Sequence, residues 1–117
     1  MNSQQIFDTV VTHLRTMPGK AFVQGKGCMY RTPTGNCCAA GKLIKDEEYK
    51  PEMEGRNVLG LVANTLFPDR LLPHLHLIVK LQQVHDNDSN WTDNKFNEAG
   101  EAWLSEIAHN FSLRYSS

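Results

Sequence analysis

Apolar residues near the start of the chain recur every three or four positions, which is the spacing of one face of an α-helix. The positions are Ile6, Phe7, Val10, Val11, Leu14 and Met17. Asn2 and Gln5 have the spacing of a capping box, and Pro18 followed by Gly19 is a helix stop signal. The pattern therefore predicts an amphipathic helix over residues 2–17.

The same periodicity returns three times in the second half of the chain and predicts helices over residues 58–66, 73–84 and 96–111. The last of these has the most regular apolar face, formed by Phe96, Ala99, Trp103, Leu104, Ile107, Ala108 and Phe111. We expect this whole face to pack in the core.

Residues 20–45 break the helical periodicity. The run 28–31 is typical of a strand, residues 32–35 (Thr-Pro-Thr-Gly) are typical of a tight turn, and the chain returns through residues 36–37. The small residues that follow predict a short helix or tight crossing over residues 38–44. The predicted class is α+β and mostly helical, a single domain over residues 1–117 with about four helices and one small antiparallel β-hairpin inserted after the first helix.

Composition and charge narrow the function classes. The chain has 117 residues, of which 40% are hydrophobic, and no apolar run approaches the ~18–20 residues of a membrane span. Residues 1–45 hold six basic residues and one acidic residue (+5), whereas residues 46–117 hold six basic and twelve acidic residues (−6). Either these two parts attract each other within the fold, or the first part forms a basic face for an acidic protein surface or a phosphate.

The three cysteines are an odd set, Cys28, Cys37 and Cys38, and no leader pattern opens the chain. We expect free thiols in a reducing compartment such as the cytoplasm, with one cross-turn disulfide as the alternative. Because the cysteines and histidines lack the spacings of a metal site, we expect no metal and no cofactor.

One set of residues suggests an enzyme or a small-ligand-binding domain. Cys38 would lie at the start of the short helix, whose dipole lowers a thiol pKa, and His85 with Asp86 would supply a base and an orienting carboxylate. The alternative is a cysteine buried among alanine and glycine, which we favour because small apolar residues flank Cys38.

A second set suggests a binding surface. Tyr30, Arg31 and Pro33 lie on the predicted hairpin, with Lys26 and Lys42 on either side. Aromatic residues beside arginine are typical interface anchors. The same basic and aromatic residues would suit single-stranded nucleic acid, but they are few and the chain is nearly neutral.

Four short motifs in this chain resemble those of a known protein family. The chain has Tyr-Arg-x-Pro-x-Gly from residue 30, Cys-Ala-x-Gly-x-Leu-Ile from residue 38, Asp-Glu-Glu-Tyr from residue 46 and Leu-Gln-x-x-His-Asp from residue 81, followed by Trp91. This pattern resembles a family of short uncharacterised proteins from bacteria and their phages, although Thr34 and Lys45 stand where that family has aspartate and proline. The resemblance implies a phage or prophage origin and brings no established activity.

Together these observations predict a small non-catalytic protein-binding module. The family resemblance and the small size imply that it binds and inhibits a bacterial host factor, such as a component of an antiviral defence system. The alternatives are the enzyme or ligand-binding domain that uses Cys38, His85 and Asp86, and a nucleic-acid-binding module. The sequence does not predict an oligomeric state.

Overall fold

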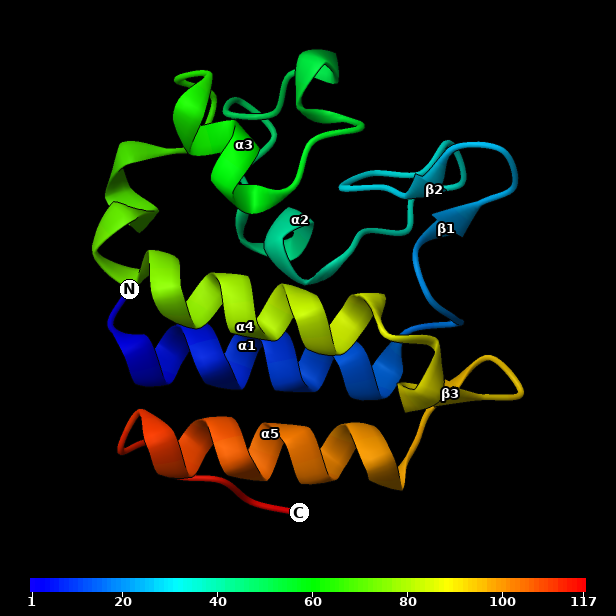
Figure 1. Ribbon diagram of the computed structural model, residues 1–117, viewed down its shortest axis with the longest axis vertical. Coiled ribbons are helices and arrows are strands. Elements are labelled where there is room, and N and C mark those ends of the chain that lie inside the picture. The colour runs from blue at the N-terminus through cyan, green and yellow to red at the C-terminus, as the bar shows by residue number, and fades with distance from the viewer.

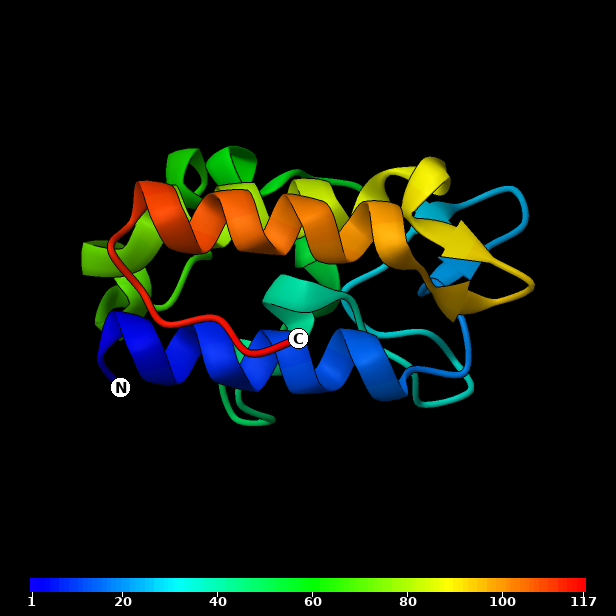
Figure 2. The same ribbon diagram turned by 90° about the horizontal axis from the view of Figure 1, so that it is seen from below.

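The computed structural model describes all residues 1–117 and has five α-helices and two small antiparallel hairpins. The three longest helices are α1 (Ser3–Thr16), α4 (Leu75–Asp86) and α5 (Glu98–Asn110). In Figures 1 and 2, α4 and α5 lie side by side and run in opposite directions, and α1 lies beneath them. The predicted class, α+β and mostly helical, is confirmed. No helix has both the length and the apolar character needed to cross a membrane.

Local signals set the ends of these helices. Asn2 and Gln5 form the predicted capping box at the start of α1, and the helix ends before Met17. Helix α3 (Val58–Ala63) is capped by the side chain of Asn57, which accepts a hydrogen bond from the Gly60 amide. Pro73 does not open α4 but lies in the preceding 3₁₀ helix η2 (Asp69–His74). Two further 3₁₀ turns are η1 (Pro51–Met53) and η3 (Asp88–Asn90).

The short helix α2 (Ala39–Leu43) forms where the run of small residues predicted a short helix, and it lies against both α1 and α4 (Figure 1). Its close approach to the preceding segment depends on Gly41. A Cβ atom at this position would lie 2.1 Å from the backbone carbonyl oxygen of Tyr30, far inside van der Waals contact. Only glycine fits there.

The first hairpin lies earlier in the chain than predicted. Strand β1 (Phe22–Val23) pairs with β2 (Gly27–Cys28), whereas residues 28–31 and 36–37 do not form a ladder. The turn at residues 32–35 does form, since the Gly35 amide donates to the Thr32 carbonyl at 3.0 Å. Its flanks cannot pair as strands because the Glu54 carboxylate accepts the amides of both Tyr30 and Arg31, at 2.9 and 3.0 Å.

The second hairpin was not predicted. Strands β3 (Trp91–Thr92) and β4 (Lys95–Phe96) are joined by Asp93 and Asn94, whose φ angles of 51° and 65° are those of a type I′ turn. Phe96 therefore belongs to a strand, and α5 begins after the Asn97 cap.

The core confirms most of the predicted apolar faces but not all of α5. Leu104, Ile107 and Ala108 are buried there together with the apolar faces of α1 and α4. Trp103 was predicted to be buried and is instead 42% exposed. Ala99 is exposed as well, so the buried stripe of α5 is narrower than its periodicity indicated.

Candidate functional site

Three segments that are separate in the sequence meet at one end of the helical layers. They are the β1–β2 hairpin (residues 22–28), the turn at residues 32–36 and the β3–β4 hairpin (residues 91–96), which together form the right-hand end in Figure 1. We call this surface the hairpin end. Its loops are held by residues from the last turn of α4, which carry the candidate catalytic groups.

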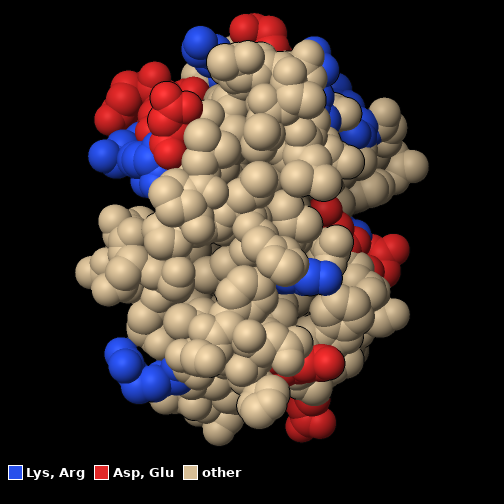
Figure 3. All heavy atoms as spheres, turned by 60° about the vertical axis from the view of Figure 1, so that its left-hand side comes forward, with Lys and Arg blue, Asp and Glu red and all other residues tan.

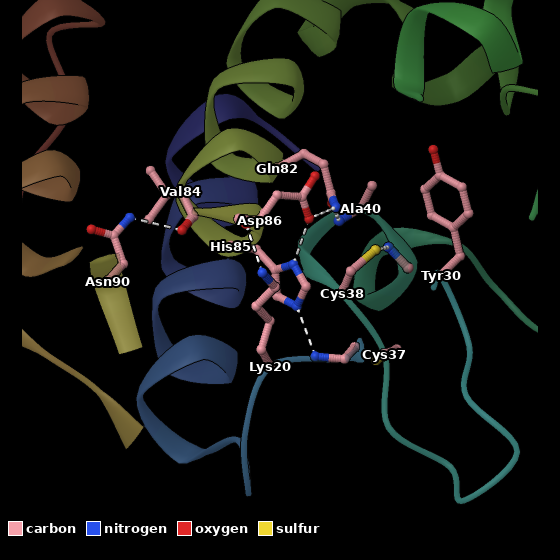
Figure 4. A network of polar contacts seen from close by, with 12 residues as sticks. Lys20, Tyr30, Cys37, Cys38, Ala40, Gln82, Val84, His85, Asp86 and Asn90 are labelled. Carbon is pink, nitrogen blue, oxygen red and sulfur yellow. Dashed lines mark hydrogen bonds and ion pairs between the residues drawn. The ribbon is translucent and has the colours of Figure 1, made fainter. Parts of the chain in front are cut away.

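His85 lies at the end of α4 and is completely buried. Its Nε2 accepts the backbone amide of Ala21 at 3.1 Å, and its Nδ1 lies 2.8 Å from Asp86 Oδ1 (Figure 4). Because a backbone N–H only donates, Nε2 is the acceptor and Nδ1 carries the proton that is donated to Asp86. Both ring nitrogens are therefore occupied, and the ring ties α4 to the residue that precedes β1.

Gln82 and Trp91 extend this connection. The Gln82 amide nitrogen donates to Asp86 Oδ1 at 2.9 Å, and its oxygen accepts the backbone amide of Ala40 in α2, also at 2.9 Å. Trp91 donates its indole N–H to the His85 carbonyl at 2.8 Å. The Leu-Gln-x-x-His-Asp segment thus holds β1, α2 and β3 at once. We call Gln82, His85 and Asp86 the clasp.

Cys38 lies at the start of α2, as predicted, but it is not placed as a nucleophile. Its Sγ accepts the Gly41 amide at 3.3 Å as the helix cap, and the residue is 1% exposed. Burial raises the pKa of the Cys38 thiol far above its ordinary value, which opposes thiolate formation. No hydrogen bond joins Cys38 to His85, whose nitrogens are already engaged. The arrangement supports packing rather than thiol chemistry.

The donor atoms of Cys28, His85 and Asp86 lie within 4.8 Å of one another, a grouping that sequence spacing did not reveal. A metal ion at His85 Nδ1 would require the ring proton to move to Nε2, where it would face the Ala21 N–H. Two donors would then point at each other. Burial, followed by the nearby Asp86 charge, also raises the pKa of the Cys28 thiol to about 11. These contacts favour the hydrogen-bonded state over a metal centre.

All three cysteines are free, and we expect three thiols per chain when the denatured protein is titrated without reductant. In the native protein we expect Cys38 to be alkylated last, because burial raises the pKa of its thiol and covers it. Timed alkylation followed by peptide mapping measures both results. One thiol per chain, or alkylation of Cys38 before Cys28 and Cys37, would contradict the expectation.

Two of the five candidate interface residues turn inward. Tyr30 is 5% exposed, and its hydroxyl donates to the Arg56 carbonyl at 2.7 Å. Arg31 donates to the Ile44 carbonyl at 3.0 Å, and its guanidinium lies 4.7 Å from the Tyr49 ring centroid. The sequence suggested surface anchors here. In the structure these side chains instead hold residues 44–56 against the core, because Glu54 draws the Tyr30–Arg31 backbone inward.

The other three candidates, Lys26, Pro33 and Lys42, are exposed. Pro33 lies in the 32–36 turn and Lys26 between β1 and β2, so both belong to the hairpin end. Lys42 lies on α2 beside a separate shallow pocket of about 370 Å³, next to Arg31. The structure therefore brings two of the five candidates together at the hairpin end.

The two oppositely charged parts of the sequence pair with each other. Three ion pairs join them: Arg15 with Glu101, Lys20 with Asp88, and Arg31 with Asp46. On the face that Figure 3 shows, basic and acidic atoms are interspersed and form no continuous basic patch. The contacts support internal pairing, and of the first six basic residues only Lys26, Lys42 and Lys45 take part in no ion pair.

Phe22 is the most exposed aromatic side chain of the hairpin end, and no sequence pattern predicted its exposure. Its side chain is 51% exposed, with the Lys20 ammonium 5.7 Å from the ring centroid. It borders two hollows of about 520 and about 500 Å³, one toward Trp91 and Asn94 and the other toward Pro33. A two-residue strand has no alternation to indicate which side chain faces solvent, so no local pattern marks Phe22.

Comparisons with protein-family models, with curated proteins and with solved structures find no match to this chain.

Proposed function

We propose that this protein is a non-catalytic protein-binding module and that the hairpin end is its binding face, with Phe22 as the central anchor. The observation that carries the proposal is a half-exposed aromatic side chain bordered by two hollows. Interface energy concentrates in aromatic anchors at the centre of a contact, and hollows beside an anchor accept side chains of the partner.

The rigidity of the hairpin end supports the same proposal. The clasp fixes the entry to β1 through Ala21, and Asn36 donates its side-chain amide to the Gly19 carbonyl at 3.1 Å. Loops that are ordered before binding lose less conformational entropy when a partner docks. Phe22 would therefore meet a partner from a fixed position.

The charge of the hairpin end favours a protein over a nucleic acid. Lys26 and Lys95 are exposed there, but Asp93 is exposed there too and Asp88 is exposed next to it, whereas binding to a phosphate backbone requires a predominance of basic residues. The proposed partner is a host factor of the bacterial cytoplasm, such as a component of an antiviral defence system, which the module would inhibit by covering its surface. The motif resemblance supports this choice of partner class.

The test compares Phe22→Ala with Leu59→Ala, which removes a side chain of similar exposure (56%) from α3. Partners are captured from bacterial lysate with the unmodified protein, and a captured protein is then purified for binding measurements. We expect Phe22→Ala to weaken its binding by ~2 kcal/mol, roughly 30-fold, with thermal unfolding nearly unchanged. Leu59→Ala should leave the affinity unchanged.

Charge reversal at the rim provides a second measurement. Lys26→Glu should change mainly the association rate and its dependence on salt, as exposed rim charges do. If Phe22→Ala binds as tightly as the unmodified protein while Leu59→Ala binds weakly, the binding face lies on α3 and the hairpin end is only a structural terminus.

A further inference from the structure

Trp103 is a large aromatic side chain exposed outside the hairpin end. It projects from α5 with 42% of its surface exposed and borders a groove of about 290 Å³ between α4 and α5. The α5 wall of the groove also includes Glu106, Ile107 and Phe111, and the α4 wall carries Lys80. An exposed tryptophan beside a partly apolar groove is costly to leave in water and is typical of an interface.

On the opposite flank of α5, a comparable groove is covered by the C-terminal segment of the chain itself. There residues 112–116 lie along the channel between α1 and α5 (Figure 2). Gln4 exchanges two hydrogen bonds with the backbone of Arg114, at 2.8 and 3.0 Å, and Arg15 donates to the Ser116 carbonyl at 2.6 Å. The protein's own C-terminal segment thus covers one flank of α5, and the Trp103 groove on the other flank is left open.

The charges of the open groove identify what would cover it. Lys80 and Glu106 lie on its two walls, and neither takes part in an ion pair within the chain. In a two-fold interface residue i of one copy contacts residue j of the other and the reverse, so a surface with one exposed charge of each sign forms two opposite-charge pairs when the axis lies between them. A uniformly acidic or basic partner would attract one of these charges and repel the other.

We infer that the α4–α5 groove is a homodimer interface, in which a second copy of this chain covers the groove through a two-fold axis. Trp103 of each copy packs on the apolar groove wall of the other. Lys80 of each copy faces Glu106 of the partner subunit. The groove opens on the flank of the helices, so the dimer leaves both hairpin ends free, and the inference does not rest on the proposed function.

The first test is the mass of the full chain in solution, measured by light scattering and sedimentation over a wide concentration range. We expect a reversible equilibrium between a monomer of 13.2 kDa and a species of twice that mass. Trp103→Ala should weaken dimerisation at least roughly tenfold, as the loss of a buried aromatic anchor does. Leu59→Ala, which removes an exposed apolar side chain outside the groove, is the matched control and should dimerise normally.

A charge-exchange cycle tests the two-fold symmetry itself. Lys80→Glu and Glu106→Lys should each weaken the dimer several-fold, because each places like charges opposite one another twice. The double variant K80E/E106K should restore the dimer, since it reverses both partners. Thermal unfolding of dilute, monomeric samples shows that the variants remain folded, so a loss of dimer is not a loss of fold.

Three outcomes would overturn the inference. A chain that stays monomeric up to millimolar concentration would assign the groove to a different protein. A dimer that Trp103→Ala leaves intact would place the interface elsewhere on the molecule. A double variant that is weaker than either single variant would show that Lys80 and Glu106 do not face each other across a two-fold axis.

Discussion

Gly41→Ala is expected to lower the free energy of unfolding by more than ~3 kcal/mol, a large share of the ~5–15 kcal/mol that stabilises a typical domain. The added Cβ would lie 2.1 Å from the Tyr30 carbonyl oxygen and 2.9 Å from the Tyr30 carbonyl carbon. These are backbone atoms, which cannot rotate away as a side chain would. Relief would require α2 to move off the 28–31 segment, and α2 is packed against α1 and α4.

Gly60→Ala is the matched control, because Gly60 also lies in a short helix. Its added Cβ would meet the Asn57 Oδ1 at 3.2 Å and the Arg56 Cβ at 3.4 Å, and the helix propensity of alanine offsets part of this crowding. We expect a change within about 1 kcal/mol. Urea denaturation followed by circular dichroism measures both variants. Equal losses of stability in the two variants would mean that Gly41 and the Tyr30 carbonyl are farther apart than in the structure.

Tyr30→Ala is expected to cost ~3–5 kcal/mol of folding stability, the range for truncating a buried aromatic side chain. Tyr30 is 5% exposed and fills space beneath residues 44–56. Tyr30→Phe removes only the hydroxyl that donates to the Arg56 carbonyl and should cost ~1 kcal/mol. Phe22→Ala, on the exposed side of the hairpin end, should change stability by no more than about 0.5 kcal/mol.

Chemical denaturation of these three variants, with partner binding measured in parallel, distinguishes a residue that stabilises the fold from one that binds the partner. Tyr30→Ala should lose stability, and Phe22→Ala should lose binding. If instead Tyr30→Ala folds normally and binds poorly, Tyr30 is a surface anchor and the inward placement of its ring is wrong.

The helices were predictable because their signals are local. The periodicity of α1 and its capping box lie within a few residues of each other, and the structure confirms both. The hairpins were not predictable in the same way. Residues 28–31 are typical of a strand in sequence, but the Glu54 carboxylate, from a later part of the chain, accepts the amides of Tyr30 and Arg31. A tertiary contact of this kind overrides local propensity and leaves no mark in the local pattern.

The candidate site residues were likewise predictable where their signal is local, and not where their role depends on tertiary contacts. The neighbouring His85 and Asp86 were visible as a pair, yet their function in the fold depends on Ala21 and Gln82, which only the fold brings to them. Trp103 shares the spacing of the α5 apolar face but lies at its margin, so periodicity alone placed it in the core. Phe22 carried no signal, because exposure in a two-residue strand depends on what covers it.

The clasp has a consequence for local unfolding. Through His85 and Gln82, one turn of α4 supplies the hydrogen-bond acceptors for the amides of Ala21 and Ala40. Fraying of that turn would release the start of the first hairpin and the start of α2 in the same event. We therefore expect the two segments to open as one cooperative unit, with similar protection against amide hydrogen exchange. A partner that holds the hairpin end closed would slow exchange in α2, which it does not touch.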